Sequence, residues 1–453
     1  MNLYGKQTEL ALKHFAVGTE KWPVEMIHAQ VVIKKAAARV NAKLGVLDTN
    51  VAQSIDKAAG EVLSSKYADQ FPLSIWQSGS GTQFNMNVNE VLANRATELL
   101  ARHGNPSSPR LLRMDGLEVH PNDHVNMSQS TNDTIPTAIH IAALLQLQRE
   151  LSPAIERLVE SFTKKSKEFK RIIKIGRTHL QDAVPMTLGQ EFSGYARQLE
   201  YALEHLQETS RGLRELAIGG TALGTELNAP KGYRTKIIRE INTLTGLKCI
   251  PAKNLFANMA AHDAVVATSG ALKTLAVAVM KIANDIRWLS SGPRAGLSEI
   301  TFPANEPGSS IMPGKVNPTQ SEMVMMVCAQ VIGNDTAITT SAATTSNFEM
   351  QASKPLLAHA LLQSIRLLAD AARSFDEHCA QGIEPNVARL GEYAERSLML
   401  VTALNKHIGY DKAAEIAKKA YIDDSTLEDA AIALGYVTQK QFRQWVDAKK
   451  MVG

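Results

Sequence analysis

The sequence has few aromatic residues: they make up 5% of its 453 residues, although 44% of the residues are hydrophobic. Aromatic and β-branched side chains are typical of β-sheets, whereas Ala, Leu and Met favour helices. A chain of this length can form one large core or two to three domains. The composition therefore favours packed helices over a β-sandwich.

Cysteine is scarce as well. The three cysteines, Cys249, Cys328 and Cys379, lie far apart, and no CxxC pair is present. This usage argues against a disulfide framework and is typical of a reducing compartment. The first residues lack an apolar signal core, and we find no apolar run that approaches the ~18 residues of a membrane span. We therefore predict a cytoplasmic protein with no membrane partner.

Neither sign of charge dominates, because 49 basic and 45 acidic residues leave a net charge of +4. Proteins that bind nucleic acid usually carry a strong basic excess, so we predict no nucleic-acid partner. The mild positive balance is compatible with an anionic substrate.

Apolar residues recur every three or four positions along the middle of the chain, as on one face of a helix. Two such stripes contain Phe192, Tyr195, Leu199, Leu203 and Leu206, and Leu272, Leu275, Val279, Ile282, Ile286 and Leu289. We expect helix from about residue 132 to about residue 291. Long stripes without strand signals predict an all-α fold built on an elongated bundle of long helices. We expect an N-terminal domain (1–131), a central bundle (132–391) and a small helical C-terminal domain (392–453).

The stretch Gly308–Pro318 interrupts this pattern, because its glycines and prolines forbid a regular helix. Ser309 and Ser310 place two hydroxyls at its start, and Lys315 and Asn317 stand near its end. A flexible loop of this kind can close over a small substrate, and the lysine and asparagine can hold an anion beneath it. An ordinary turn between helices is the alternative.

Two further stretches are rich in hydrogen-bond donors. The first contains Ser80, Gly81 and Thr82, whose hydroxyls and backbone N–H groups suit a carboxylate-binding loop. The second contains Ser130, Thr131 and Asn132, which supply more donors than one helix cap requires. Helix capping is the alternative interpretation of both.

Histidines mark two more stretches. His120 and His124 stand four apart with Asp123 between them, but no third cluster completes a metal site, and we predict none. His179 could act as a general acid or base, and Glu322 is a possible partner that would fix its tautomer.

A glycine-rich stretch at 219–225 resembles a nucleotide-binding loop only superficially. It lacks a preceding apolar strand and the GxGxxG spacing, so we reject that interpretation.

Taken in order, the stretches at 77–87, 120–133, 176–183 and 308–320 resemble those of class II fumarate hydratases, in the fumarase/aspartase superfamily. The similarity of sequence extends from Leu3 to the last residues of the chain. The resemblance implies a homotetramer with a central twenty-helix core, and reversible conversion of fumarate and water to (S)-malate. It implies a small dicarboxylate substrate, no cofactor, no metal, and pockets shared among three subunits.

The resemblance also implies roles for single residues. Ser309 would be the catalytic base, and His179, paired with Glu322, would serve the water or the leaving hydroxyl. Lys315 would stabilise the negative charge that develops on the substrate. Substrate contacts would come from Ser80, Gly81, Thr82, Ser130, Thr131, Asn132, Thr178, Ser310, Lys315, Val316 and Asn317. A secondary dicarboxylate site would be formed by His120, Pro121, Asn122 and Asp123.

The chain differs from the family's usual sequence at two places that bear on these expectations. Leu117 and Glu118 stand where a basic residue is common, which predicts weak binding at the secondary site. The residues from Gln351 to Ser353 also differ, which predicts altered kinetics. Two alternatives stay open: an aspartate ammonia-lyase of the same superfamily, and a catalytically inactive structural or binding protein on this scaffold.

Overall fold

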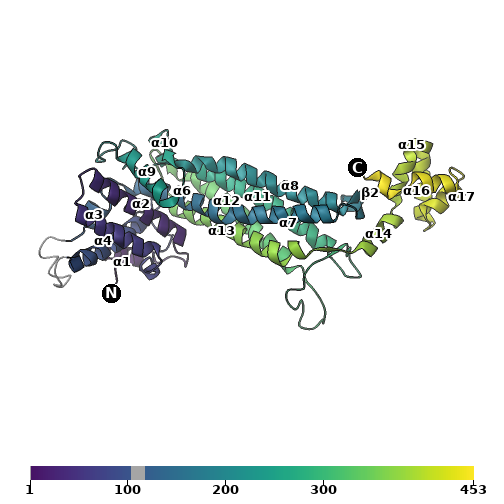
Figure 1. The fold of residues 1–453 in the computed structure, drawn as a ribbon, viewed down its shortest axis with the longest axis horizontal. Helices are drawn as coiled ribbons and strands as arrows, with labels where there is room; N and C mark the ends of the chain where they lie inside the picture. The colour runs from purple at the N-terminus through teal and green to yellow at the C-terminus, as the bar shows by residue number, and fades with distance from the viewer. Residues whose placement is uncertain (1, 104–117, 453) are drawn as a thin grey trace. The chain divides into compact units, whose positions relative to one another are not determined.

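The computed structural model describes residues 2–103 and 118–452, and helices dominate it (Figure 1). The predicted all-α class is confirmed. The chain divides into two compact units. The first unit comprises Met1–Pro153, Ala202–Ala276 and Val327–Asp370. The second comprises Ala154–Tyr201, Val277–Met326 and Ala371–Gly453. The three predicted domains are a different division and stay a prediction.

The first unit is built around α2 (Val24–Lys43), which contacts α3, α6 and α9. Most of α2 is buried, including Ile33 and Lys34, so this helix lies in the core rather than on the surface. The other α-helices of this unit that lie wholly within it are α1 (Lys6–His14), α3 (Thr49–Leu63), α4 (Thr82–His103), α6 (Thr131–Gln146), α9 (Tyr233–Thr245) and α10 (Leu255–Ala260). It also holds the short 3-10 helices η1 (Ala68–Gln70) and η4 (Ser210–Arg214) and the short π-helices η2 (Pro121–Val125) and η3 (Leu147–Leu151). Its two-residue strands are β3 (Glu215–Leu216), β4 (Ile250–Pro251), β6 (Ser346–Asn347) and β7 (Met350–Gln351).

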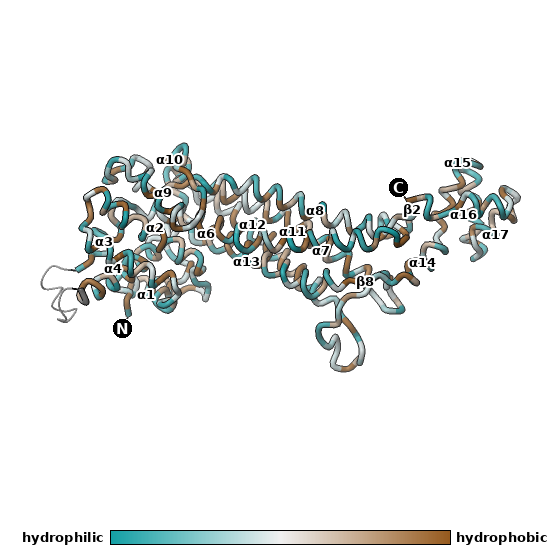
Figure 2. Tube along the Cα trace, viewed as in Figure 1, coloured by the Kyte–Doolittle hydropathy of each residue, from teal (hydrophilic) through white to brown (hydrophobic). Residues whose placement is uncertain are grey.

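The two predicted stripes lie on long helices, α8 (Leu188–Thr209) and α11 (Asp263–Leu289). The other long helices after α6 are α7 (Ser152–Glu168), α12 (Thr319–Thr344) and α13 (Lys354–His378). Phe192 and Leu199 on α8 and Leu275 on α11 are fully buried, as the spacing predicts. Apolar and polar positions alternate along these helices (Figure 2).

Among the described residues, α11 is long and apolar enough to cross a membrane, and half of its most apolar window is buried. The sequence showed no continuous apolar run there, because Ser269, Lys273 and Thr274 interrupt it. Buried core helices pass the same test, so length and composition alone are weak evidence for a membrane span.

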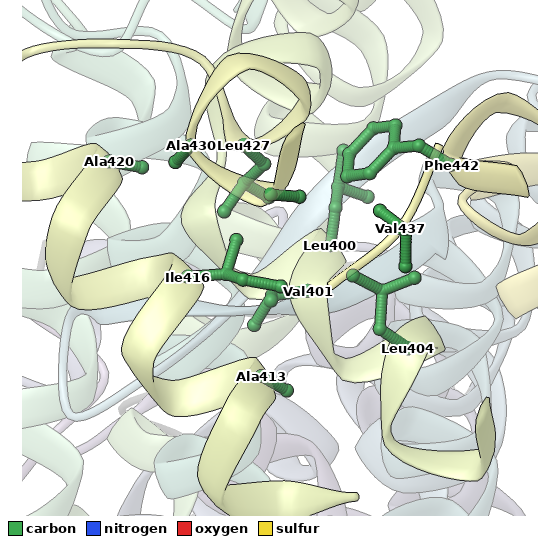
Figure 3. Packing of buried hydrophobic residues seen from close by; sticks show 11 residues of the cluster. Leu400, Val401, Leu404, Ala413, Ile416, Ala420, Leu427, Ala430, Val437 and Phe442 are labelled. Carbon is green, nitrogen blue, oxygen red and sulfur yellow. The ribbon is translucent and has the colours of Figure 1, made fainter. Parts of the chain in front are cut away.

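The end of the chain has a core of its own (Figure 3). Leu404, Ile416 and Ala431 are completely buried, and Leu427 and Phe442 pack into the same cluster. The elements of this region are α14 (Val387–Arg396), η6 (Leu398–Leu404), α15 (Asn405–Ile408), α16 (Tyr410–Ile422), α17 (Leu427–Ala433), α18 (Gln439–Trp445) and α19 (Ala448–Met451). The predicted short C-terminal helices are confirmed.

The prediction of helix throughout 132–291 was wrong at 173–187. There β1 (Ile173–Thr178) and β2 (Gln181–Thr187) form an antiparallel hairpin. Residues 215–232 are also mostly irregular. The second unit also holds a small sheet of β5 (Ile300–Thr301) with β8 (Glu384–Pro385), and a short 3-10 helix, η5 (Ala380–Gly382), precedes β8.

Candidate active site

The loop Gly308–Pro318 is closed on itself by its own backbone. Gly308 N donates to Lys315 O (3.1 Å), and Asn317 Nδ2 donates to Gly308 O (2.6 Å). A Cβ on Gly308 would lie 2.2 Å from Lys315 O, so only glycine allows this approach. Ile311, 83% exposed, stands on the outer part of the loop. The sequence therefore predicted both the loop and its irregular backbone correctly.

Ser309 is placed as an acceptor within this loop. Its Oγ accepts the N–H groups of Ile311 (3.3 Å) and Met312 (3.1 Å). Two N–H donors favour negative charge on an oxygen, which is what an alkoxide base needs. Lys315 is exposed and makes no ion pair with any described residue, so its ammonium is available to an anion.

Thr178 and His179 lie at the end of the β1–β2 hairpin. Thr178 pairs with Gln181, so His179 and Leu180 form a two-residue turn, with φ of +56° and +62°. Asn-Gly is the usual choice for such a turn, and a histidine or leucine costs of order 1 kcal/mol. Leu180 is also 72% exposed. Neither feature stabilises the isolated chain, so the turn has the character of a functional site.

A buried ion network holds the base of the hairpin. Glu299 is completely buried and pairs with Arg177 (2.5 Å) and with Lys174 (3.0 Å). Lys174 Nζ also bonds Glu191 (2.7 Å). The two cations in contact with Glu299 compensate the desolvation that a lone buried carboxylate would suffer. The network fixes the strand that presents Thr178 and His179.

The expected pair between His179 and Glu322 is not formed. Both side chains are exposed, and neither has a hydrogen bond or ion pair to any described residue. Glu322 stands in the first turn of α12. Their pairing stays a prediction for an assembly of several chains.

In the first unit, the Ser80–Thr82 turn is a connected set of hydroxyls. Ser80 Oγ lies 3.0 Å from Ser78 Oγ and 2.7 Å from Thr82 Oγ1. A Cβ on Gly81, whose φ is +81°, would lie 3.2 Å from Ile135 Cγ1. The turn thus packs against the beginning of α6, next to Ser130–Asn132. The structure brings these two predicted stretches together.

The Ser130–Asn132 stretch begins α6, as the capping interpretation predicted. Ser130 forms a capping box with Asp133, and Asn132 Nδ2 donates to Ala222 O (3.0 Å). Thr131 Oγ1 accepts from Asn85 Nδ2 (3.1 Å), which leaves its O–H free to donate. Capping and ligand binding are therefore compatible here.

Beneath this stretch lies a buried polar network. Lys34 Nζ donates to Asn126 Oδ1 (2.7 Å), and Asn85 Nδ2 approaches the same oxygen (3.3 Å). Burial lowers the pKa of Lys34 to about 7, and the Asp133 carboxylate partly offsets the shift. Burial raises the pKa of Asp133 to about 7, against the opposing effect of backbone N–H donors and Lys34.

The residues that depart from the usual family text, Gln351–Ser353, form a compact network next to the Ser80 turn. Gln351 and Ser353 hydrogen-bond each other and Thr345, and Ser353 also bonds Ser341. Lys354 N donates to Gly79 O (2.9 Å), so this segment abuts the turn directly. The effect of the departure on kinetics stays a prediction.

Comparison with known proteins identifies the family. A model described as Lyase matches residues 2–333, and one described as Fumarase C C-terminus matches residues 400–453. A protein of Thermosynechococcus vestitus named fumarate hydratase class II is 56% identical over 450 residues, 99% of this chain and 94% of its own. One of the same name from Myxococcus xanthus is 54% identical over 451 residues, 100% of this chain and 95% of its own. The chain belongs to the class II fumarate hydratase family. The resemblance seen in the sequence is confirmed.

Solved structures agree. The class II fumarase of Schistosoma mansoni matches with a TM-score of 0.94 at 42% identity, covering 99% of this chain and 95% of that one. A 3-carboxy-cis,cis-muconate lactonizing enzyme of Pseudomonas putida matches with a TM-score of 0.71 at 18% identity, over 94% and 91% of the two chains. The second match shows the fold alone. A fold shared by different enzymes does not fix the reaction, so the site residues must carry that argument.

The residues predicted to form a secondary dicarboxylate site are held by local hydrogen bonds. His120 Nδ1 accepts Asp123 N (3.1 Å), and His124 Nδ1 accepts His120 N (2.9 Å). Pro121 and Asn122 lie within η2 between them. Glu118 is exposed, whereas Leu117 lies outside the described residues. Among those residues, no group of three or more His, Cys, Asp and Glu side chains could hold a metal ion.

The sequence did not single out two buried charged residues, Asp133 and Lys354. Both side chains are fully buried, and Lys354 Nζ has no hydrogen-bond partner among the described residues. Burial lowers the pKa of Lys354 to about 8. Asp133 stands three residues after Ser130, which is a capping-box spacing that the sequence displays. Nothing in the sequence indicates the burial of Lys354.

Proposed function

We propose that this protein catalyses the reversible hydration of fumarate to (S)-malate, without a cofactor, in the cytoplasm. The observation that carries the proposal is the identity of 54–56% along essentially the whole chain to proteins named fumarate hydratase class II. A small dicarboxylate is the substrate. The arrangement of Ser309, whose oxygen accepts two backbone N–H groups, suits the proton abstraction that this reaction requires.

In the malate-to-fumarate direction, Ser309 removes a proton from the carbon next to a carboxylate. The electron pair moves into that carboxylate, which becomes a doubly negative aci-carboxylate. The exposed ammonium of Lys315 and the amide of Asn317 stabilise this charge as it develops. Ser310 and Val316, on the same loop, complete the contacts with substrate.

The leaving hydroxyl departs from the opposite face with a proton from the group formed by His179 and Glu322, which gives anti elimination. The carboxylate partner holds the imidazole in one tautomer. In the hydration direction the same pair activates water. Thr178 binds a substrate carboxylate beside them.

The remaining contacts hold the substrate in place. Ser80, Gly81 and Thr82 offer hydroxyl and backbone donors to one carboxylate, and Ser130, Thr131 and Asn132 offer donors at the start of α6. His120–Asp123 forms a secondary dicarboxylate site, which is weak because of Leu117 and Glu118.

We infer that the active protein is a homotetramer with a central twenty-helix core, and that each pocket draws on three chains. The side chains of His179 and Glu322, which are exposed and pair with no residue that the structure describes, support this proposal, as does the exposed Leu180 turn. These groups acquire partners only when another chain supplies them.

The deciding experiment offers purified protein (S)-malate and L-aspartate in separate reactions. Fumarate absorbs in the ultraviolet and neither substrate does, so its appearance reports turnover. We expect fumarate from malate only. Fumarate from aspartate but not malate would identify an ammonia-lyase, and no turnover with any dicarboxylate would identify an inactive scaffold.

A further inference from the structure

The glycine-rich turn that begins at Gly219 binds an anion that belongs to this chain. Gly219 N and Thr221 N donate to Asp133 Oδ2, at 3.0 Å and 2.9 Å. Gly219 has φ of +94° and Thr221 has φ of +57°, so the turn points both N–H groups to one side. Such concave turns are typical anion sites. Here the anion is a side-chain carboxylate rather than a phosphate.

The other oxygen of Asp133 reaches the start of α6. Asp133 Oδ1 accepts Ser130 N at 2.9 Å, and the side chain is completely buried. The same turn also holds Asn132, whose Nδ2 donates to Ala222 O at 3.0 Å. The start of α6 is therefore fixed at two points, through Ser130 and through Asn132.

A helix cap alone does not require this arrangement. An ordinary capping box needs one bond from the N3 side chain to the N-cap N–H, and exposed examples work well, such as Gln441 with Thr438. Asp133 makes two additional bonds to a segment 86 and 88 residues away, at full burial. Burying a carboxylate is unfavourable unless several donors meet it. The extra bonds define the position of Ser130–Asn132 relative to a second segment.

We propose that Asp133 is a positioning residue that holds Ser130, Thr131 and Asn132 in the geometry that recognises a substrate carboxylate. Asp133 does not touch the substrate; it acts through the three residues before it and through the Gly219–Thr221 turn. This inference rests on the proposed function, because that function assigns substrate contacts to Ser130–Asn132.

The test is Asp133→Asn, which keeps the shape of the side chain but turns one of its two acceptor oxygens into a donor. That NH₂ group then faces an N–H of Ser130 or of the turn, so at least one bond is lost. We expect KM for malate to rise roughly 10- to 100-fold, the range for loss of a hydrogen bond to a charged group, with a smaller change in kcat.

The matched control is Asp335→Asn. Asp335 is also buried in the first unit, and it accepts from Ser269 Oγ (2.7 Å) and Lys273 Nζ (2.6 Å) on α11. It has no part in the proposed site, so this variant should lose stability and keep its KM. If Asp133→Asn behaves in the same way, Asp133 only holds the fold, and the proposal is wrong.

Two arms keep the test decisive. If Asp133→Asn does not fold, Gly219→Ala replaces it, since the added Cβ would lie 2.8 Å from Arg234 Cβ and must displace the turn. An unchanged KM in that variant overturns the proposal.

If the wild-type protein does not convert malate, the proposed function has failed. Calorimetric titration with fumarate then measures binding directly, and equal affinity of wild type and variant overturns the positioning role.

Discussion

Ser309 carries the most demanding chemistry that we propose for a single side chain. A serine hydroxyl is a poor base in water, and the N–H groups of Ile311 and Met312 supply the stabilisation that its ionised form needs. We expect Ser309→Ala to lower kcat by roughly 10³-fold or more, near the upper range for loss of a general base. Steady-state assay with malate measures this loss.

The same variant should stay folded, because Ser309 stands on a loop whose side chains contribute little to the core. Its thermal unfolding should match that of wild type, and calorimetry should still detect dicarboxylate binding. Near-normal turnover would remove Ser309 as the base.

Side-chain chemistry was readable from the sequence where polar residues were dense. Ser309, Lys315 and His179 stood out because polar side chains of these types do not stabilise an apolar helical core. Asp133 and Lys354 did not stand out, because their surroundings come from segments far away in the chain. Asp133 accepts from Gly219 and Thr221, and the backbone N–H of Lys354 donates to Gly79 O. A sequence shows residue types, whereas burial is a property of the packed chain.

At the scale of elements, the contact between the Ser80 turn and the segment before α13 depends on one glycine. A Cβ on Gly79 would lie 1.6 Å from Ala352 O, a distance that no repacking of side chains can relieve. We expect Gly79→Ala to separate the two segments, raise KM for malate and lower stability by about 1–3 kcal/mol. Urea unfolding and steady-state kinetics measure the two effects.

Gly60→Ala is the matched control for this prediction. Gly60 lies within α3, where a Cβ would meet only Lys35 Nζ at 3.8 Å. Alanine is the better helix former by about 1 kcal/mol, so this variant should be equally or more stable, with unchanged KM. If Gly79→Ala also proves neutral, the two segments do not need their close contact.

Helices with regularly spaced apolar residues were predictable from the sequence, and the short strands were not. The stripe from Phe192 to Leu206 matches α8, because one buried face repeats over about four turns. The β1–β2 hairpin was not predicted. Lys174 and Ile175 are both buried, so β1 lacks the alternation of apolar and polar residues that marks a half-buried strand. Its turn gave no signal either, since His179-Leu180 lacks the asparagine and glycine that usually mark one.

At the scale of the whole molecule, buried histidines make folding sensitive to pH. Burial lowers the pKa of His140 to about 4, while in the unfolded chain it should titrate near ~6.5. Below that value the unfolded chain binds a proton that the folded chain rejects, so stability falls as pH drops from about 6.5 to about 4. The contribution lost is of order 3 kcal/mol.

His140→Gln removes this titration. Urea unfolding at fixed protein concentration should show a flatter decline in stability between pH 7 and pH 4.5 for the variant than for wild type. Parallel declines would mean that His140 is solvated or protonated in the folded protein.

Assembly is the remaining property that we propose for the site. His179 and Glu322 are exposed and pair with no described residue of their own chain, and the loop of Ser309 projects exposed apolar residues such as Ile311. If each pocket takes His179 and Ser309 from different chains, inactive His179→Asn and inactive Ser309→Ala proteins should restore activity when unfolded together and refolded as a mixture. About one quarter of the pockets would then contain both native residues, since each position is native with a chance of about one half.

Each variant refolded alone is the control and should stay inactive. Differently tagged chains that co-purify establish that mixed tetramers have formed. Mixed tetramers without activity would show that each pocket takes both residues from one chain, and the shared site would then be wrong for this protein.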